Sequence, residues 1–503
     1  MTNGRVSHLG EWSGSVPFFL AATGAAVGLG NIWKFPYVVG ENGGGAFVLV
    51  YLLFVFIIGL PLFMSEMMIG RRGRQSPYHS FYILVSEETK SRHWAKLGGL
   101  VTIAGFLILS YYSVVAGQVM AYSVRVASGT FIGMSADGVL NTYNLFRSNP
   151  ETLLAWHTIF MVTACVVVAR GVKHGLEKTV KIMIPMLLIM LLALIAYAVY
   201  NHSFINGASY LFDFDFKKLI YARDVTGSFI VDSSGAYQLT FKGLFMAMGH
   251  AFFTLGLSVG AMMIYGAYLD RDVSISKVAF SVAIADTTIA LLAGLAIFPI
   301  VFAYGLSAAQ GPSLVFTTLP IAFGAMNFGS ILGSLFFLTL FFAALTSAIA
   351  LLEPSVTWLI ERSKMTRVQA TVWAGGACWL VGIISVFALS GVNLRNIVYA
   401  VADFSSIVDI DLTHRLYNLN GFQIIDGIVT LVILPLGGLL IAVFAGWIIS
   451  PENSLEELNI KKRWLYKTWQ ILIRYVSPVL VFVIFVAGLI EWIRKYLLYQ
   501  PVL

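Results

Sequence analysis

The chain is poor in charge and in cysteine. Only 11% of its 503 residues are Asp, Glu, Lys or Arg, whereas soluble domains carry about 25%. Hydrophobic residues make up 58%, and the mean hydropathy is +0.83. These values exclude an ordinary soluble protein and indicate a polytopic membrane protein. The two cysteines, Cys165 and Cys378, lie in apolar stretches. They predict buried thiols rather than a disulfide framework or a metal site.

Signatures of several other functions are also missing. The sequence has no His/Cys metal cluster, no P-loop and no nucleophile elbow, so nothing in it supports a membrane enzyme or an organic cofactor. The net charge of +7 does not indicate nucleic-acid binding, because the cations concentrate in short loops between apolar segments. Residues 1–13 are polar and lead into long apolar segments, so we expect no cleavable signal peptide.

Long apolar runs predict eleven membrane-spanning helices in one domain over 1–503. Lys and Arg gather in the loops after the even-numbered segments. The positive-inside rule therefore places the N-terminus in the cytoplasm and the C-terminus outside. The longest outer loops are 127–152, 201–241 and 392–421, and the second has the turn residues of an exposed hairpin. The eleven segments are 15–38, 43–70, 97–127, 153–171, 175–200, 242–268, 277–305, 329–360, 367–391, 422–449 and 469–495.

The first apolar segment is interrupted at its centre by residues 24–31. This stretch contains Gly24, Gly28 and Gly30, followed directly by Asn31. Glycine costs roughly 1 kcal/mol in a helix, and an unpaired backbone group costs several kcal/mol in hydrocarbon. A broken helix at this depth is tolerated where its freed carbonyls and amides face protein or a bound solute. Such a break is how a binding site for a small charged molecule is built inside a bilayer.

The sixth apolar segment has a similar interruption at residues 252–260, where Ser258 lies between Gly256 and Gly260. Segments one and six hold corresponding positions in two five-segment halves, 11–200 and 242–450. Paired breaks of this kind indicate a transporter with inverted repeats. The alternative for each segment is close helix packing through small residues. That alternative is less favoured when both segments show the break at matching positions.

The residues around both breaks resemble the neurotransmitter:sodium symporter family. The resemblance rests on GLGNIWKFPY at 28–37, ENGGGAF at 41–47, FFTL at 252–255 and LTSAIA at 345–350. It implies an all-α integral membrane protein with the LeuT fold. In that fold a 5+5 inverted repeat has helices 1 and 6 broken, and here one extra helix follows at about 469–495. It also implies a sodium-coupled symporter of the inner (plasma) membrane that works by alternating access, with two Na⁺ as coupling ions.

Two sodium sites are implied by the resemblance. The first joins helices one and eight, through the carbonyls of Gly24, Val27 and Ala343 and the side chains of Thr346 and Ser347. From the residues alone, the alternative for the adjacent Thr and Ser is hydrogen bonding within their own helix. The second site touches the substrate carboxylate, and its ligands are Ala26, Asn31, Thr254 and Asp286.

Asp286 departs from the family pattern, because well-known members have Asn at this position. An acid at membrane depth is costly and marks a functional site. Many chloride-independent relatives place a Glu one turn further on, which is Ala290 here. We therefore expect Asp286 to be both sodium ligand and fixed negative charge. This predicts chloride-independent transport and leaves open a proton release on the return step. The alternative is a structural Asp paired with a Lys, for which the segment offers no partner.

The substrate expectation starts at Gly28, where monoamine transporters of the family carry an Asp that holds the amine. The missing side chain leaves room for a carboxylate near the Gly30 amide and the Tyr112 hydroxyl, so the resemblance implies an α-amino acid. Gly256 and Val259 replace larger family residues, which favours a hydrophobic or aromatic substrate side chain. The other implied residues of the ammonium contacts and side-chain pocket are Ala26, Val27, Phe253, Thr254, Ser347 and Leu351.

An outer gate is implied above a lid of Tyr112 and Phe253. Lys34, Asp426 and His250 occupy the positions of the family's Arg–Asp pair and neighbouring Gln. Because Lys lacks the bidentate geometry of Arg, the pair is expected to be looser. We interpret His250 as a neutral residue that takes over the hydrogen bonds of the Gln, with pH-sensitive gating as the alternative.

An inner gate is implied by Trp12, Tyr268 and Glu361. The Arg that the family places three residues before the Trp is Leu9 here, so Arg5 is the nearest cation and the inner salt bridge is in doubt. Glu66 is expected to accept free amides of the broken sixth helix rather than to bind an ion.

Other functions remain open at this point. The expected partners are an amino acid, sodium and the lipid bilayer, with no nucleic acid. A same-fold symporter for another small zwitterion, such as an osmolyte, is the nearest alternative. A sensor would bind substrate without sodium-driven accumulation, and a channel would carry currents too large for a stoichiometric cycle.

Overall fold

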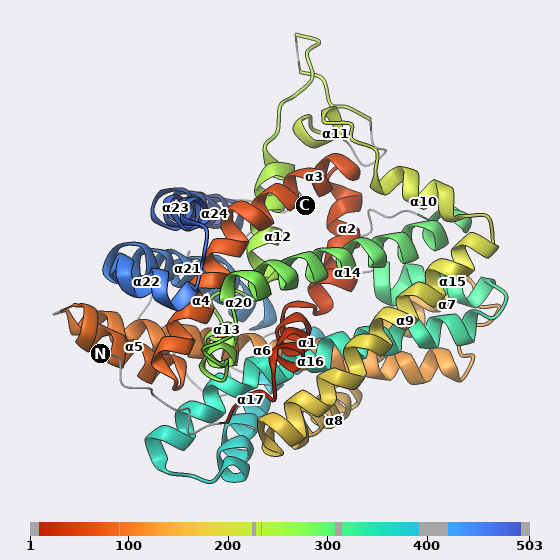
Figure 1. The fold of residues 1–503 in the computed structure, drawn as a ribbon. Coiled ribbons are helices and arrows are strands. Elements are labelled where there is room, and N and C mark those ends of the chain that lie inside the picture. The colour runs from red at the N-terminus through yellow and green to blue at the C-terminus, as the bar shows by residue number, and fades with distance from the viewer. Residues whose placement is uncertain are drawn as a thin grey trace, which may run out of the picture.

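The computed structural model describes residues 10–89, 91–223, 228–232, 234–306, 314–391 and 421–493, and these form a bundle of helices (Figure 1). The described residues contain isolated β-bridges and no longer strand. Arg5, loop residues 392–420 and the end of the last predicted helix lie outside the described residues. The all-helical fold class is confirmed.

Each predicted membrane segment coincides with one helix or with consecutive helical elements. The first five segments are α1 (Ser15–Ala26), η1 (Gly30–Lys34) and α2 (Phe35–Glu41); α3 (Gly45–Phe54), η2 (Val55–Gly59) and α4 (Leu60–Gly73); α6 (Lys96–Ala127); α8 (Pro150–Ala169); and η4 (Val172–Glu177) with α9 (Lys178–Tyr200). The next four are α12 (Lys242–Thr254) and α13 (Ala261–Ala267); α14 (Ile275–Ala303); α16 (Gly329–Ser363); and α17 (Arg367–Leu389). The last two are α20 (Gly421–Gly427), η6 (Ile428–Ile433), α21 (Leu434–Val443) and η7 (Phe444–Ile448); and α23 (Arg463–Ile471), η8 (Leu472–Val476) and α24 (Ser477–Ile493).

Length and apolarity identify most of these segments as membrane-spanning. Nine helices of the described chain are long and apolar enough to cross a membrane, and the bent pair Ser15–Ala26 and Gly30–Glu41 makes ten. The sixth predicted segment is divided between α12 and α13, and neither half reaches the length of a span. The structure therefore agrees with the predicted positions of the segments.

Both predicted breaks are present. The helix axis bends by 52° between Ser15–Ala26 and Gly30–Glu41, and Val27 between them has an extended backbone with ψ 104°. Between α12 and α13 the backbone reaches positive φ at Gly256 (60°), Ser258 (64°) and Gly260 (76°). Glycine adopts this conformation at no steric cost. The two interruptions place free backbone groups inside the bundle.

The broken helices pack against the most buried part of the bundle. In Figure 1, α1 lies near the centre of the bundle, where it packs against α16. The long helices α6 and α16 both contribute residues to the site described below. α4 and α13 approach so closely that a Cβ at Gly70 would lie 1.8 Å from the Met263 carbonyl oxygen. In α16, 78% of the most apolar window is buried, against 17% in the last span.

The loops contain short helices that hydropathy did not reveal. They are α5 (Pro77–Glu88), η3 (Arg92–Ala95), α7 (Ala136–Arg147), α10 (Phe204–Leu211), α11 (Lys217–Ile220), η5 (Leu314–Thr318) with α15 (Leu319–Ala325), and α22 (Pro451–Leu458). In the second outer loop the antiparallel bridges Tyr221–Leu239 and Val231–Tyr237 form the predicted hairpin, which projects beyond the helices (Figure 1).

Candidate functional site

In the break of the first span, the backbone amides at Gly28 and Leu29 are hydrogen-bonded to side chains. The Gly28 amide donates to Asn31 Oδ1 at 3.1 Å, and the Leu29 amide donates to Tyr112 Oη at 3.4 Å. A Cβ at Gly28 would lie 2.8 Å from Ser347 Oγ and 3.4 Å from Tyr112 Oη. A Cβ at Gly30 would meet no atom within 4 Å. The hydroxyls of Ser347 and Tyr112 therefore lie next to Gly28, at a place that a side chain at Gly28 would obstruct.

A cluster of polar groups lies beside this break. Asn31 Nδ2 donates to Asp286 Oδ1 at 2.8 Å and to Thr254 Oγ1 at 3.2 Å. Thr254 Oγ1 donates to Asp286 Oδ2 at 2.7 Å, and Tyr51 Oη lies 3.3 Å from Thr254 Oγ1. All four side chains are buried. The structure brings Asn31, Thr254 and Asp286 together from the first, sixth and seventh spans. Ala26, the fourth predicted ligand, is the last residue of α1.

A second set of oxygens joins the first span to α16. Ser347 Oγ lies 3.4 Å from the Gly24 carbonyl oxygen and 3.2 Å from that of Val27. Thr346 Oγ1 instead donates to carbonyls of its own helix, Phe342 at 3.0 Å and Ala343 at 3.1 Å. A Cβ at Gly24 would lie 3.2 Å from Thr346 Cβ, so the two helices touch here. Ser347 therefore meets the Gly24 and Val27 carbonyls, whereas Thr346 and the Ala343 carbonyl are hydrogen-bonded to each other within α16.

The residues predicted to line the side-chain pocket lie mainly on the unwound sixth segment and on α16. Val259 and Leu351 are 4% and 8% exposed. Both face Gly105 of α6, whose Cβ would lie 2.7 Å from the Val259 carbonyl oxygen and 3.4 Å from that of Leu351. At Gly256 a Cβ would meet only the Ala25 carbonyl oxygen, at 3.7 Å. Phe253 and Tyr112 are half-buried.

Glu66 of α4 supports the unwound sixth segment. Its Oε1 accepts a hydrogen bond from the Ser258 amide at 2.6 Å, and its side chain is fully buried. The prediction that Glu66 accepts a free amide of the broken helix is confirmed. Its carboxylate compensates a backbone group that hydrocarbon would leave unpaired.

The predicted outer-gate residues gather around one cavity. Lys34, His250, Phe253 and Asp426 all line a cavity of about 810 Å³. Lys34 Nζ lies 5.2 Å from the centre of the Phe253 ring, a cation–π distance. No ion pair joins Lys34 to Asp426 in the described part of the chain.

His250 lies between two rings rather than in a polar network. Its ring is 5.7 Å from that of Phe35 and 5.3 Å from that of Tyr51. Neither ring nitrogen has a hydrogen-bond partner among the described residues. The expectation that His250 takes over the hydrogen bonds of the family's Gln is therefore wrong here, because aromatic rings surround the imidazole.

At the predicted inner gate, Trp12 packs the start of the first span against α13. Its Nε1 donates to the Tyr265 carbonyl at 3.2 Å, and its amide donates to the Tyr268 carbonyl at 3.3 Å. Ser13 adds a contact to the fifth span, where Glu177 accepts from the Ser13 amide at 3.1 Å and hydroxyl at 2.9 Å. These bonds fasten the described start of the N-terminal segment, and the predicted role of Arg5 lies outside the described residues.

Tyr268 is bonded to Glu353 rather than to the predicted Glu361. Tyr268 Oη donates to Glu353 Oε1 at 2.6 Å, and Arg367 Nη2 donates to Glu353 Oε2 at 2.6 Å. Neither Glu353 nor Arg367 is among the inner-gate residues predicted from the sequence. The signal available was an acid at membrane depth, which requires a partner.

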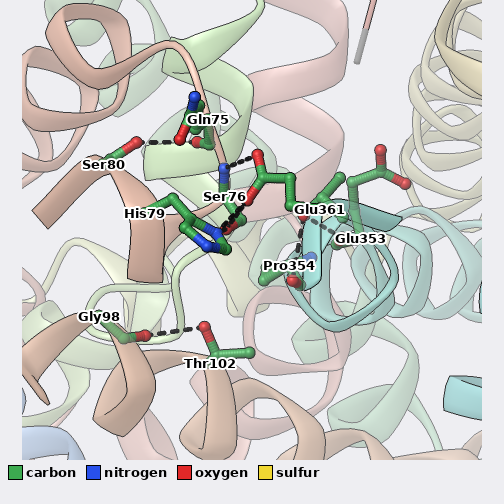
Figure 2. Close-up of polar contacts among 10 residues, drawn as sticks. Gln75, Ser76, His79, Ser80, Gly98, Thr102, Glu353, Pro354 and Glu361 are labelled. Atoms are coloured by element: carbon green, nitrogen blue, oxygen red, sulfur yellow. Dashed lines mark hydrogen bonds and ion pairs between the residues drawn. The ribbon is translucent and has the colours of Figure 1, made fainter. Parts of the chain in front are cut away.

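Glu361 belongs to a different contact. Its carboxylate accepts from the Ser76 amide at 2.8 Å, from the Ser76 hydroxyl and from His79 Nδ1 at 2.5 Å. Figure 2 shows Glu361 turned toward Ser76 and His79, whereas Glu353 on the same helix points away. Glu361 therefore fastens α5 to the end of α16.

Comparison with known proteins identifies the family of the chain. A profile described as the Sodium:neurotransmitter symporter family matches residues 9–145 and 148–416. An uncharacterised sodium-dependent transporter of Bacillus subtilis, YhdH, is 33% identical over 482 residues, covering 94% of this chain and 96% of its own. An uncharacterised sodium-dependent transporter of Haemophilus influenzae is 30% identical, with coverage of 95% and 98%.

A solved structure extends the comparison to the fold. The crystal structure of MhsT in complex with L-phenylalanine matches with a TM-score of 0.79 and 35% identity, covering 96% of this chain and 100% of MhsT. Bovine sodium-dependent neutral amino acid transporter B(0)AT2 is 26% identical over 58% of this chain and 40% of its own. The chain belongs to the sodium:neurotransmitter symporter family, which consists of secondary transporters and not enzymes.

Proposed function

We propose that this protein is a sodium-coupled symporter that imports an α-amino acid with a hydrophobic or aromatic side chain, without requiring chloride. One observation carries the proposal. Gly28 lies next to the Tyr112 hydroxyl and is linked through Asn31 to the carboxylate of Asp286, and the space beside the neighbouring Gly30 is open, with no atom within 4 Å of a Cβ built there. The site thus combines room for a substrate carboxylate with a fixed negative charge for a cation.

The substrate carboxylate would bind at the break in the first span. The Tyr112 hydroxyl and the amides near Gly30 are hydrogen-bond donors there, and the start of the second half-helix adds a positive dipole end. The ammonium group would face carbonyls of Ala26, Phe253 and Thr254. A side chain at Gly28 would block this arrangement, because its Cβ would lie only 2.8 Å from Ser347 Oγ.

An apolar pocket would hold the substrate side chain. Its walls are Val27, Phe253, Val259 and Leu351, and Gly256 leaves its far side without a side chain. The similar structure of MhsT contains L-phenylalanine, which supports the same substrate class for this chain. One methylene changes selectivity by only about 1–3 kcal/mol, so several large apolar amino acids are expected to bind.

Two sodium ions would be transported with the substrate. The first would lie between the carbonyls of Gly24, Val27 and Ala343 and the hydroxyls of Thr346 and Ser347. Thr346 would exchange one of its hydrogen bonds within the helix for this contact. The second would lie against Asn31, Thr254 and Asp286, the Ala26 carbonyl and the substrate carboxylate. Oxygen ligands of this kind suit a hard cation.

The charge of Asp286 supports chloride independence. Its two carboxylate oxygens already point toward Asn31 and Thr254, the proposed sodium ligands. A fixed anion in contact with the ion removes the need for a mobile anion nearby. When the carrier returns without sodium, protonation of the Asp286 carboxylate would remove a buried charge. The proposal therefore includes release of this proton when sodium next binds.

Closure on each side would complete alternating access. We assign the outer closure to Lys34 above Phe253, with Asp426 and His250 on the same cavity. The inner closure combines Trp12, the bond from Tyr268 to Glu353, and Arg367 behind it. Glu361 contributes by holding α5 against α16 (Figure 2). The N-terminus is placed on the cytoplasmic side by the distribution of Lys and Arg.

Uptake by the purified protein in proteoliposomes tests the proposal. We expect accumulation of radiolabelled phenylalanine or leucine when external sodium exceeds internal sodium, and equal uptake in sodium chloride and sodium gluconate. Binding without accumulation would indicate a sensor. Competition by an amino acid methyl ester as strong as by the free amino acid would contradict the proposed carboxylate–sodium contact. Selective uptake of a betaine would favour an osmolyte carrier.

A further inference from the structure

The last membrane span begins with a group of cations that the transport site does not use. Lys461, Lys462, Arg463 and Lys467 lie at and just before the start of α23, and all four are exposed. No ion pair or side-chain hydrogen bond of the described residues involves any of them. We call these four residues the basic group. Their charge is therefore available to an external anion.

The rotation of α23 is fixed by two buried aromatic residues. Tyr466 Oη donates to the Pro451 carbonyl at 3.0 Å, and Trp469 Nε1 donates to the Pro61 carbonyl at 3.3 Å. Their side chains are 7% and 4% exposed. Because these two residues face the protein, Lys467 on the same helix is turned away from it.

The outward stripe of this helix continues into a lipid-facing surface. Trp464, Ile471, Tyr475 and Val479 are 62%, 56%, 55% and 61% exposed. Their spacing of seven, four and four residues keeps them on one face of the helix. Only 17% of the most apolar window of this span is buried, the lowest value among the described spans, and α23 and α24 lie at an edge of the bundle (Figure 1). A basic group at the end of such a stripe lies at the level of lipid headgroups.

We propose that the basic group and Trp464 form a binding site for the headgroup of an anionic phospholipid. The lipid belongs to the leaflet on the side of the positive loops. Lys and Arg bind the phosphate, Trp464 lies at the interface, and the acyl chains follow Ile471 and Tyr475. Glu452 and Glu456 on the neighbouring α22 are the exposed acids closest in sequence, and the four cations exceed them in number. Clusters of this composition next to a membrane helix recognise anionic lipids by charge.

Native mass spectrometry of the full-length protein tests the site. The probes are phosphatidylglycerol and phosphatidylcholine with identical acyl chains. Each cation near an anionic membrane surface contributes roughly fivefold in affinity. We therefore expect at least tenfold weaker phosphatidylglycerol binding when Lys461, Lys462, Arg463 and Lys467 are all changed to Gln, with phosphatidylcholine binding unchanged. The control changes Arg271, Lys277, Arg362 and Lys364 to Gln, because these exposed cations lie in or next to two other loops on the same side. It should stay within about twofold of the wild type.

A second measurement keeps the test independent of variant stability. Brominated phosphatidylglycerol in proteoliposomes should quench the fluorescence contributed by Trp464, obtained as the difference between wild type and Trp464→Phe. Brominated phosphatidylcholine should quench it less. Equal quenching by the two lipids would overturn the proposal, as would an equal loss of lipid binding in the control variant. Displacement of phosphatidylglycerol by millimolar inorganic phosphate would assign the site to free phosphate instead, and would equally overturn it.

Discussion

Replacement of Asp286 by Asn tests the electrostatic basis of the site with almost no change in shape. In the wild type, Asn31 and Thr254 donate to separate oxygens of the carboxylate, at 2.8 and 2.7 Å. An Asn has one acceptor oxygen and one NH₂ group in the same positions. One of the two donors would then face another donor. The substitution therefore removes a charge-assisted hydrogen bond as well as the charge itself.

The expected loss follows from these contacts. A hydrogen bond to a charged group contributes about 1.5–3 kcal/mol. The attraction between a carboxylate and a cation at 4 Å is about 4 kcal/mol at an effective dielectric constant of 20, before the cost of burying the charge is subtracted. A net loss of about 1.5–3 kcal/mol corresponds to a roughly ten- to hundredfold weaker apparent sodium affinity. Because the variant lacks the fixed anion, chloride should restore part of the loss.

Sodium-dependent binding of a radiolabelled amino acid measures this effect. Titrations with sodium chloride and with sodium gluconate should coincide for the wild type and separate for Asp286→Asn. Asp426→Asn is a matched control, because it changes a second acid to its amide but on the outer cavity. It should leave the sodium dependence in place. Unchanged sodium affinity in Asp286→Asn, or strict chloride dependence of the wild type, would refute the role assigned to Asp286.

Three further predictions address the substrate contacts and the inner closure. Gly28→Ala should weaken amino acid binding at least tenfold, since the Cβ of the alanine would lie 2.8 Å from Ser347 Oγ. Full binding by a folded variant would contradict the proposed position of the substrate carboxylate beside Gly28. Tyr112→Phe should raise the Kd of the amino acid about ten- to hundredfold, the value of one hydrogen bond to a charged group, and an unchanged Kd would remove Tyr112 from the site. Glu353→Gln should increase the labelling rate of a cysteine introduced on the cytoplasmic face of α13, because the Tyr268 hydroxyl loses its charged acceptor at 2.6 Å. Glu361→Gln should increase labelling less, and equal effects would place both acids in one gate.

Much of the fold could be predicted because hydropathy and glycine placement report directly on membrane depth. The two broken helices were visible in the sequence because Gly24, Gly28, Gly256 and Gly260 are costly in a membrane helix without a function. The short helix pair η5–α15 was not visible. It is apolar but spans only Leu314–Ala325, and hydropathy alone cannot separate such a segment from the edge of a span.

The site residues divide in the same way. Residues at the two helix breaks could be assigned because the family motifs and the glycines that are costly in a membrane helix fall on the same stretches of sequence. The partner of Tyr268 could not be assigned, since Glu353 and Glu361 lie two turns apart on one helix and both are acids. Only the packing of α16 against α13 and α17 shows that Glu353 faces Tyr268 and Arg367.

The inner side shows how this chain compensates for a missing family residue. Without an Arg three residues before Trp12, the first span is held by backbone carbonyls of α13, by Glu177 and by Trp12 itself. Arg367 of α17 is bonded to Glu353 of α16, which accepts the hydrogen bond of the Tyr268 hydroxyl. Opening toward the cytoplasm would therefore break the bonds of Trp12 to backbone carbonyls, the two bonds to Glu177 and the bond from Tyr268 to Glu353, and would leave the Glu353–Arg367 pair intact. Among the described residues, such a closure would open without separating an ion pair.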